Sequence, residues 1–93
     1  MTDGQVLAAV DRAKQTFKTA ETKANRQFRK AKERAMSFYN STDVERASRH
    51  NEIKRAEAVL DADVADARIA FIDRLEQIRS GAGEWADLVP RVR

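Results

Sequence analysis

Residues 6–39 read VLAAVDRAKQTFKTAETKANRQFRKAKERAMSFY, and the apolar side chains of this stretch recur every eleven positions. Each repeat holds one large residue and two alanines. The series is Val6, Ala9, Ala13, Phe17, Ala20, Ala24, Phe28, Ala31, Ala35 and Tyr39. Eleven residues fill three turns at 3.67 residues per turn, so the apolar stripe hardly drifts around an α-helix. The pattern predicts one long helix with a single apolar seam.

A second apolar series with the same spacing lies in the C-terminal half of the chain. Its members are Ile53, Ala56, Leu60, Val64, Ala67, Phe71, Leu75 and Ile78. Between the two series stand Asn40, Ser41 and Thr42, whose side chains favour turns and caps over helix interiors. Two matching seams joined by a short turn predict an all-α, coiled-coil-like antiparallel hairpin of two helices.

Capping signals place the helix boundaries. Thr2 to Gln5 has the T-x-x-Q form of a capping box, and Thr42 to Glu45 has the T-x-x-E form. We therefore expect helices over about 3–39 and 43–79, each roughly 55 Å long, with a turn at 40–42. We expect the second helix to end at Ser80-Gly81. Residues 1–80 then form the hairpin, and 81–93 form a short tail with one possible helical turn.

The tail holds the only tryptophan, Trp85. One interpretation is that Trp85 folds back onto the open end of the hairpin, near Val6, Leu75 and Ile78. The other is that it anchors a partner, because tryptophan supplies a large contact area at low entropic cost.

The composition predicts a thin core. Of the 93 residues, 35% are charged and 6% are aromatic. A small chain with one narrow seam is marginal in stability, so we expect it to associate. The sequence has no cysteine, which excludes disulfides and is typical of a cytoplasmic protein. No apolar run approaches the ~20 residues of a membrane span, so no membrane partner is expected.

A second apolar stripe lies about 150° around the second helix from its seam. It consists of Ala58, Ala62, Ala65, Ile69 and Ile72. A helix that is apolar on two faces is usually buried on both, so the stripe predicts a homodimer that forms a four-helix bundle. The alternative is that the alanines stand there for helix propensity alone.

The half of the hairpin near the turn is basic. Nine basic and four acidic residues lie between Arg26 and Arg55, a net charge of +5. The candidate partner-binding residues in this half are Arg26, Arg29, Lys30, Arg49 and Arg55, with Met36, Phe38 and Tyr39 at an aromatic tip. Three interpretations remain open: a solvated charged face, a surface for an acidic protein, and a surface for nucleic acid.

Residues for catalysis or metal binding are scarce. His50 is the only histidine, and three glycines cannot build a phosphate-binding loop. We expect no enzyme activity, no metal and no cofactor. The expected function is that of a small interaction or regulatory protein that binds another protein, possibly a coiled-coil partner. The alternative is a nucleic-acid-associated protein that uses the basic half.

Overall fold

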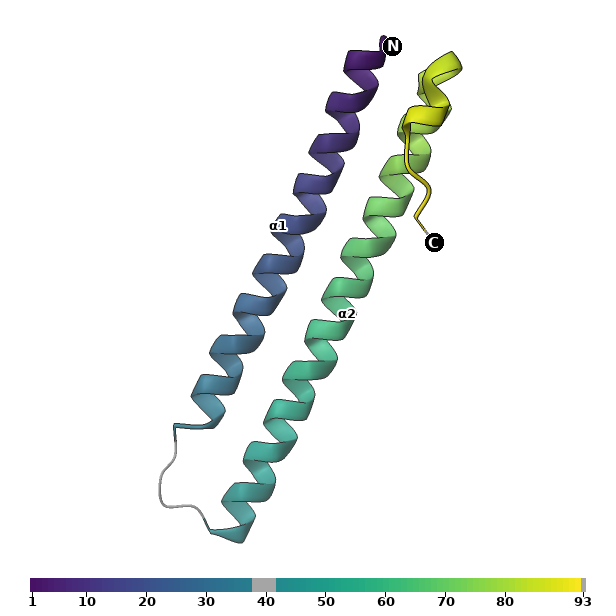
Figure 1. The fold of residues 1–93 in the computed structure, drawn as a ribbon. Coiled ribbons are helices and arrows are strands. Elements are labelled where there is room, and N and C mark those ends of the chain that lie inside the picture. Colours follow the sequence, from purple (N-terminus) through teal and green to yellow (C-terminus); the bar gives the residue numbers. More distant parts are fainter. Residues whose placement is uncertain (38–41, 93) are drawn as a thin grey trace.

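The computed structural model describes residues 1–37 and 42–92, which form two long antiparallel helices and a short 3₁₀ helix (Figure 1). Helix α1 spans Asp3–Ala35, α2 spans Asp43–Ala82, and η1 spans Gly83–Leu88. The molecule measures 64 × 18 × 12 Å. The predicted all-α hairpin is confirmed, and the described ranges contain no strand.

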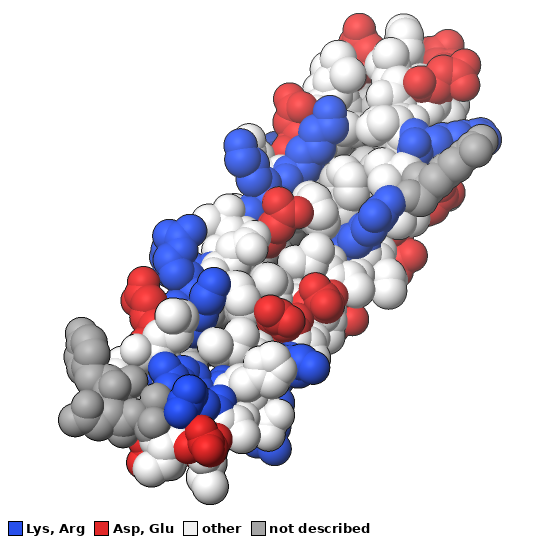
Figure 2. Space-filling view, turned by 60° about the horizontal axis from the view of Figure 1, so that its bottom comes forward, with Lys and Arg blue, Asp and Glu red and all other residues white. Residues whose placement is uncertain are grey.

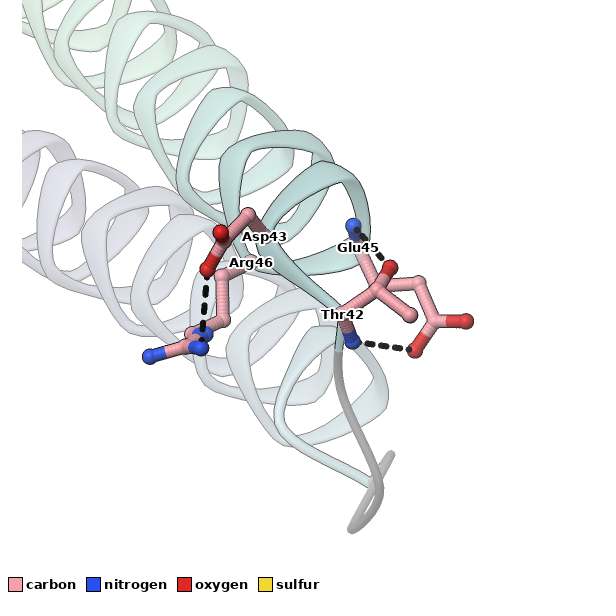
Figure 3. Close-up of polar contacts among 4 residues, drawn as sticks. All are labelled: Thr42, Asp43, Glu45 and Arg46. Atoms are coloured by element: carbon pink, nitrogen blue, oxygen red, sulfur yellow. Dashed lines mark hydrogen bonds and ion pairs between the residues drawn. The ribbon is translucent and has the colours of Figure 1, made fainter.

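Both helices begin where the capping boxes predict. The Thr2 hydroxyl accepts a hydrogen bond from the Gln5 backbone N–H at 3.2 Å, and the Gln5 side chain accepts one from the Thr2 N–H at 2.9 Å. At the start of α2, the Thr42 hydroxyl accepts from the Glu45 N–H at 3.2 Å (Figure 3). The Thr42 N–H donates to the Glu45 carboxylate at 3.3 Å. At the N-terminus of each helix, two backbone N–H groups that would otherwise lack a partner are thus hydrogen-bonded.

The end of α1 differs from the prediction. This helix stops at Ala35 rather than at position 39, with Met36 at φ −90° and ψ 4° as its C-cap. The Ser37 hydroxyl donates to the Arg34 carbonyl at 2.7 Å, and such local side-chain bonds compete with helix continuation. Of the predicted turn, only Thr42 is described, because positions 38–41 lie outside the described residues.

The end of α2 also differs, because the helix continues past Ser80-Gly81 to Ala82. Gly81 stays helical, and the chain leaves the helix only at Gly83, whose φ is +59°. A glycine inside a helix costs only about 1 kcal/mol, so it does not have to end one. As a result α2 has 40 residues and α1 has 33, rather than equal lengths.

The eleven-residue seam is confirmed. Every described member of both apolar series is buried or half-buried. Full burial, however, is concentrated at the open end of the hairpin, far from the turn. The buried cluster there consists of Val6, Val10, Ala13, Leu75, Ile78, Ala82 and Val89. Outside this cluster the buried residues are Ala24 and Ala35, so the turn-proximal half has no large buried side chain among the described residues.

The tail folds back along α2 and covers part of the open end (Figure 1). Val89 is buried in the core cluster, and Trp85 and Val92 pack against it. The Arg79 guanidinium donates to the carbonyl of Val89 at 3.3 Å and to that of Pro90 at 3.0 Å. The structure therefore places Trp85 against the hairpin core, as the first interpretation of the tail predicts.

Candidate interaction surfaces

The second apolar stripe of α2 faces solvent over most of its length. Ala58, Ala62, Ala65 and Ile69 are exposed, and Ile69 is 58% accessible. Ile72 differs, because it is half-buried. We call the four exposed residues the outer stripe. Nothing in the described chain covers it, and an exposed β-branched side chain gains nothing in a helix.

The basic half keeps most of its predicted residues on the surface. Arg26, Arg29, Lys30 and Arg55 are exposed. On the face seen in Figure 2, blue side chains lie near the grey residues at the turn, and red side chains gather at the opposite tip. One base of this half is already paired, because Arg46 forms an ion pair with Asp43 at 2.9 Å (Figure 3).

Arg49 departs from the predicted surface set. It is half-buried and lines a hollow between the helices with Ala35, Glu45 and Glu52. Its position continues the seam, because Arg49, Leu60, Phe71 and Ala82 are spaced by eleven residues. Extending the eleven-residue series in both directions would have found Arg49 and Ala82. A substitution of Arg49 would therefore alter the packing between the helices as well as the charge of the surface.

The aromatic tip is described only in part. Met36 is 57% exposed at the C-cap of α1. Phe38 and Tyr39 lie outside the described residues, so the proposed tip contact stays a prediction. Trp85, the remaining partner-binding candidate, is half-buried against the core cluster.

A groove beside the seam is a feature that the sequence reasoning missed. Its first part, with a volume of about 440 Å³, is lined by apolar residues, one threonine and two arginines. The lining is Arg12, Ala13, Thr16, Phe17, Ala20, Ala67, Ala70, Phe71 and Arg74. The rings of Phe17 and Phe71 meet here with centroids 5.3 Å apart and planes tilted by 30°. No acidic residue lines this part.

The groove continues toward the turn, because Ala20 and Ala67 also line the next hollow along the same face. That second part has a volume of about 410 Å³ and includes Lys23, Asp63 and Asp66. We call the two parts together the seam groove. Its arginine end carries Arg12 and Arg74, and its aspartate end carries Lys23, Asp63 and Asp66. No ion pair joins Lys23 to either aspartate in the described structure.

The described residues contain no group of three or more histidine, cysteine or acidic side chains that could hold a metal ion. His50 is exposed. No described helix is both long and apolar enough to cross a membrane. Comparison of the chain with models of protein families, with curated proteins and with solved structures finds no match.

Proposed function

We propose that this protein is a small helical interaction module that acts by binding another protein. The outer stripe carries this proposal, because it is an apolar surface on a long straight helix that the chain itself leaves open. Val59, beside the stripe, is also 57% exposed. Small residues such as Ala58, Ala62 and Ala65 allow a second helix to approach closely. A partner helix with a matching apolar stripe, as in a coiled coil, would bury this surface.

Affinity capture with matched variants tests the proposal. Ala62→Glu with Ile69→Glu places two charges in the outer stripe, where a docked helix would have to desolvate them. Thr19→Glu with Thr22→Glu adds the same two charges to exposed positions of α1. We expect a protein that the wild type captures to be retained by the α1 variant and lost by the stripe variant. Equal capture by all three proteins would contradict a role for the outer stripe.

Nucleic-acid binding is the second candidate, and the net charge of +5 between Arg26 and Arg55 favours it. Exposed arginines and lysines on both helices could contact phosphates. Fluorescence polarisation with duplex and single-stranded DNA of mixed sequence, measured across a range of salt concentrations, checks this candidate. Phosphate contacts predict an affinity that falls steeply with salt.

The four exposed basic residues of the basic half distinguish protein binding from nucleic-acid binding. Arg26→Glu, Arg29→Glu, Lys30→Glu and Arg55→Glu together reverse the charge of this surface and leave the half-buried Arg49 in place. Loss of DNA binding in this variant, with the captured protein retained, would support the second candidate. If the wild type binds neither DNA form at low salt, the nucleic-acid function is excluded for these probes.

A further inference from the structure

The first part of the seam groove is a hollow with a charged margin and an apolar body. Along α1 its lining begins with Arg12, on the side of the open end, and finishes at Ala20. Along the antiparallel α2 it begins with Arg74 on the same side and finishes at Ala67. Both arginines therefore stand at one end of the hollow and alanines at the other. A complementary ligand has an anionic head and an apolar tail.

The dimensions of the hollow set the size of such a ligand. Ala13 and Ala20 are seven residues apart, which corresponds to roughly 10 Å along a helix. With carbon–carbon bonds of about 1.5 Å at angles near 111°, an extended alkyl chain advances about 1.3 Å per carbon. The volume of about 440 Å³ lies within the range of roughly 300–1,000 Å³ that is typical of ligand pockets. Apolar lining with a few convergent polar groups is also typical of them.

We propose that this hollow binds a single-chain fatty carboxylate of about eight to ten carbons. The carboxylate lies between Arg12 and Arg74, and the alkyl chain follows the seam over the two phenylalanine rings toward Ala20 and Ala67. The hollow shares no residue with the outer stripe, so this ligand site goes beyond the proposed function.

The two arginines form the head site. A guanidinium group presents its N–H donors in a fork that matches a carboxylate. Neither Arg12 nor Arg74 forms an ion pair with a described residue, and Arg74 donates only to the neutral side-chain oxygen of Gln77, at 3.2 Å. The remaining polar side chain of the hollow is Thr16, whose hydroxyl already donates to the Arg12 carbonyl at 3.0 Å. Both guanidinium charges are thus available to a ligand.

The aspartate end of the seam groove fixes the direction of the ligand. Ala20 and Ala67 separate the hollow from Lys23, Asp63 and Asp66, which together carry a net charge of −1. A carboxylate placed at that end would meet two like charges. The head therefore lies at the arginines, and the tail finishes at the two alanines. A longer tail would extend among charged groups and gain little.

The aromatic pair supplies the apolar contact for the tail. The rings of Phe17 and Phe71 are half-buried, with centroids 5.3 Å apart. Ala70, which also lines the hollow, is exposed. Full burial of one methylene raises affinity about fourfold. Because the hollow is open on one side, we expect a gain of about twofold for each carbon.

Amide chemical shifts of the ¹⁵N-labelled full chain, followed during titration with single-chain probes below their micellar concentrations, test the site. From hexanoate to decanoate the affinity should rise about twofold per carbon, and from decanoate to tetradecanoate it should level off. Decanol and decyltrimethylammonium should bind about tenfold more weakly than decanoate, because they lack the anionic head. The largest shifts should lie in residues 12–20 and 67–74.

Charge variants identify the head site. Arg12→Gln with Arg74→Gln should weaken decanoate binding about tenfold and leave decanol binding unchanged. Arg29→Gln with Arg55→Gln removes two exposed arginines that do not line the hollow, so it should bind decanoate as the wild type does.

A pair of size variants identifies the tail site. Ala70→Phe fills the hollow from an exposed position, so the fold should tolerate it and decanoate binding should be lost. Thr19→Phe adds the same ring at an exposed α1 position outside the hollow and should not affect binding. Circular dichroism checks that both variants keep the helical content of the wild type.

Four results would overturn the proposal. The first is the absence of decanoate-induced shifts at millimolar concentrations. The second is decanol binding as tight as that of decanoate. The third is unchanged decanoate affinity in the Arg12 and Arg74 variant, or an equal loss in the Arg29 and Arg55 variant, which would indicate unspecific attraction to positive charge. The fourth is decanoate binding that persists in a folded Ala70→Phe variant.

Discussion

At the scale of single residues, two glycines near the end of α2 have opposite roles. Gly83 has φ +59° and ψ −121°, a conformation that residues with a Cβ rarely adopt. Gly81, two positions earlier, is helical, and a Cβ there would meet only the Met1 sulfur at 3.9 Å, an ordinary contact. The direction change between α2 and the tail therefore depends on Gly83 alone.

The same substitution should have opposite effects at these glycines. Gly83→Ala should lower the free energy of unfolding by about 1–3 kcal/mol, because the backbone conformation becomes strained. Gly81→Ala should raise it by roughly 0.5–1 kcal/mol, because alanine loses less conformational freedom in a helix. Urea denaturation followed by circular dichroism measures both. Equal effects of the same sign would mean that the chain does not turn at Gly83.

At the scale of elements, the tail is held by the buried Val89, by Trp85 and Val92, which pack against the core cluster, and by hydrogen bonds from Arg79. Val89 is 4% exposed inside the core cluster, whereas its neighbour Leu88 is 39% exposed. The Arg79 guanidinium donates to two tail carbonyls, and it also forms an ion pair with Glu76. The tail thus acts as a third packing element of the open end.

Detaching the tail should change the environment of its single tryptophan. Val89→Asp should shift Trp85 fluorescence emission to longer wavelength and reduce the free energy of unfolding by roughly 1.5–3 kcal/mol, the value of burying one valine-sized side chain. Leu88→Asp places the same charge one residue earlier on the exposed side and should change neither quantity appreciably. An unchanged Trp85 spectrum in Val89→Asp would contradict the packing of the tail.

The periodicity of the sequence predicted the two helices well and the residues at which they end poorly. The eleven-residue series and the threonine caps predicted the seam and both helix starts, because these features depend on local geometry. The predicted C-terminal ends of both helices were wrong, because Ser37 and Gly81 give ambiguous local signals. The serine favoured an early end of α1, and the glycine did not end α2. The burial of Val10 and the half-burial of Arg79 were missed, since Val10 lies outside the eleven-residue series and Arg79 contacts the folded-back tail.

The surface features were partly predictable, because the residues that share one face of a helix follow from its local geometry. Counting along the helix identified the outer stripe and the basic residues from Arg26 to Arg55. The seam groove was missed, because a groove depends on how two helices sit beside each other. Its charges belong to four separate turns of α1 and α2, and only the antiparallel packing brings Arg12 to Arg74.

At the scale of the whole molecule, packing is uneven along the rod. Phe17 and Phe28 hold equivalent seam positions, yet only Phe17 contacts the ring of Phe71, which packs against the buried cluster. Both rings are half-buried. The 3–5 kcal/mol lost on truncating a fully buried phenylalanine is therefore an upper limit at either site.

Truncating these two rings should reveal the difference between the two halves of the rod. Phe17→Ala should cost about 2–3 kcal/mol and Phe28→Ala about 1 kcal/mol, because fewer large side chains surround Phe28. Thermal unfolding monitored at the helical circular dichroism band provides the measurement. A larger loss at Phe28 would mean that the turn-proximal half, rather than the open end, holds the hairpin together.

The concentration of buried residues at the open end of the hairpin also has a thermodynamic consequence for binding. A segment with few buried contacts opens locally at a lower free energy than the rest of its domain. We expect backbone amides of α1 and α2 near the turn to exchange with deuterium faster than those around Val6 and Leu75. A partner that engages the basic half would have to suppress this opening, so part of its interaction free energy would be spent on ordering the helices. The conformational entropy change on binding would then be unfavourable, and strengthening the seam near Phe28 would tighten binding without any new contact to the partner.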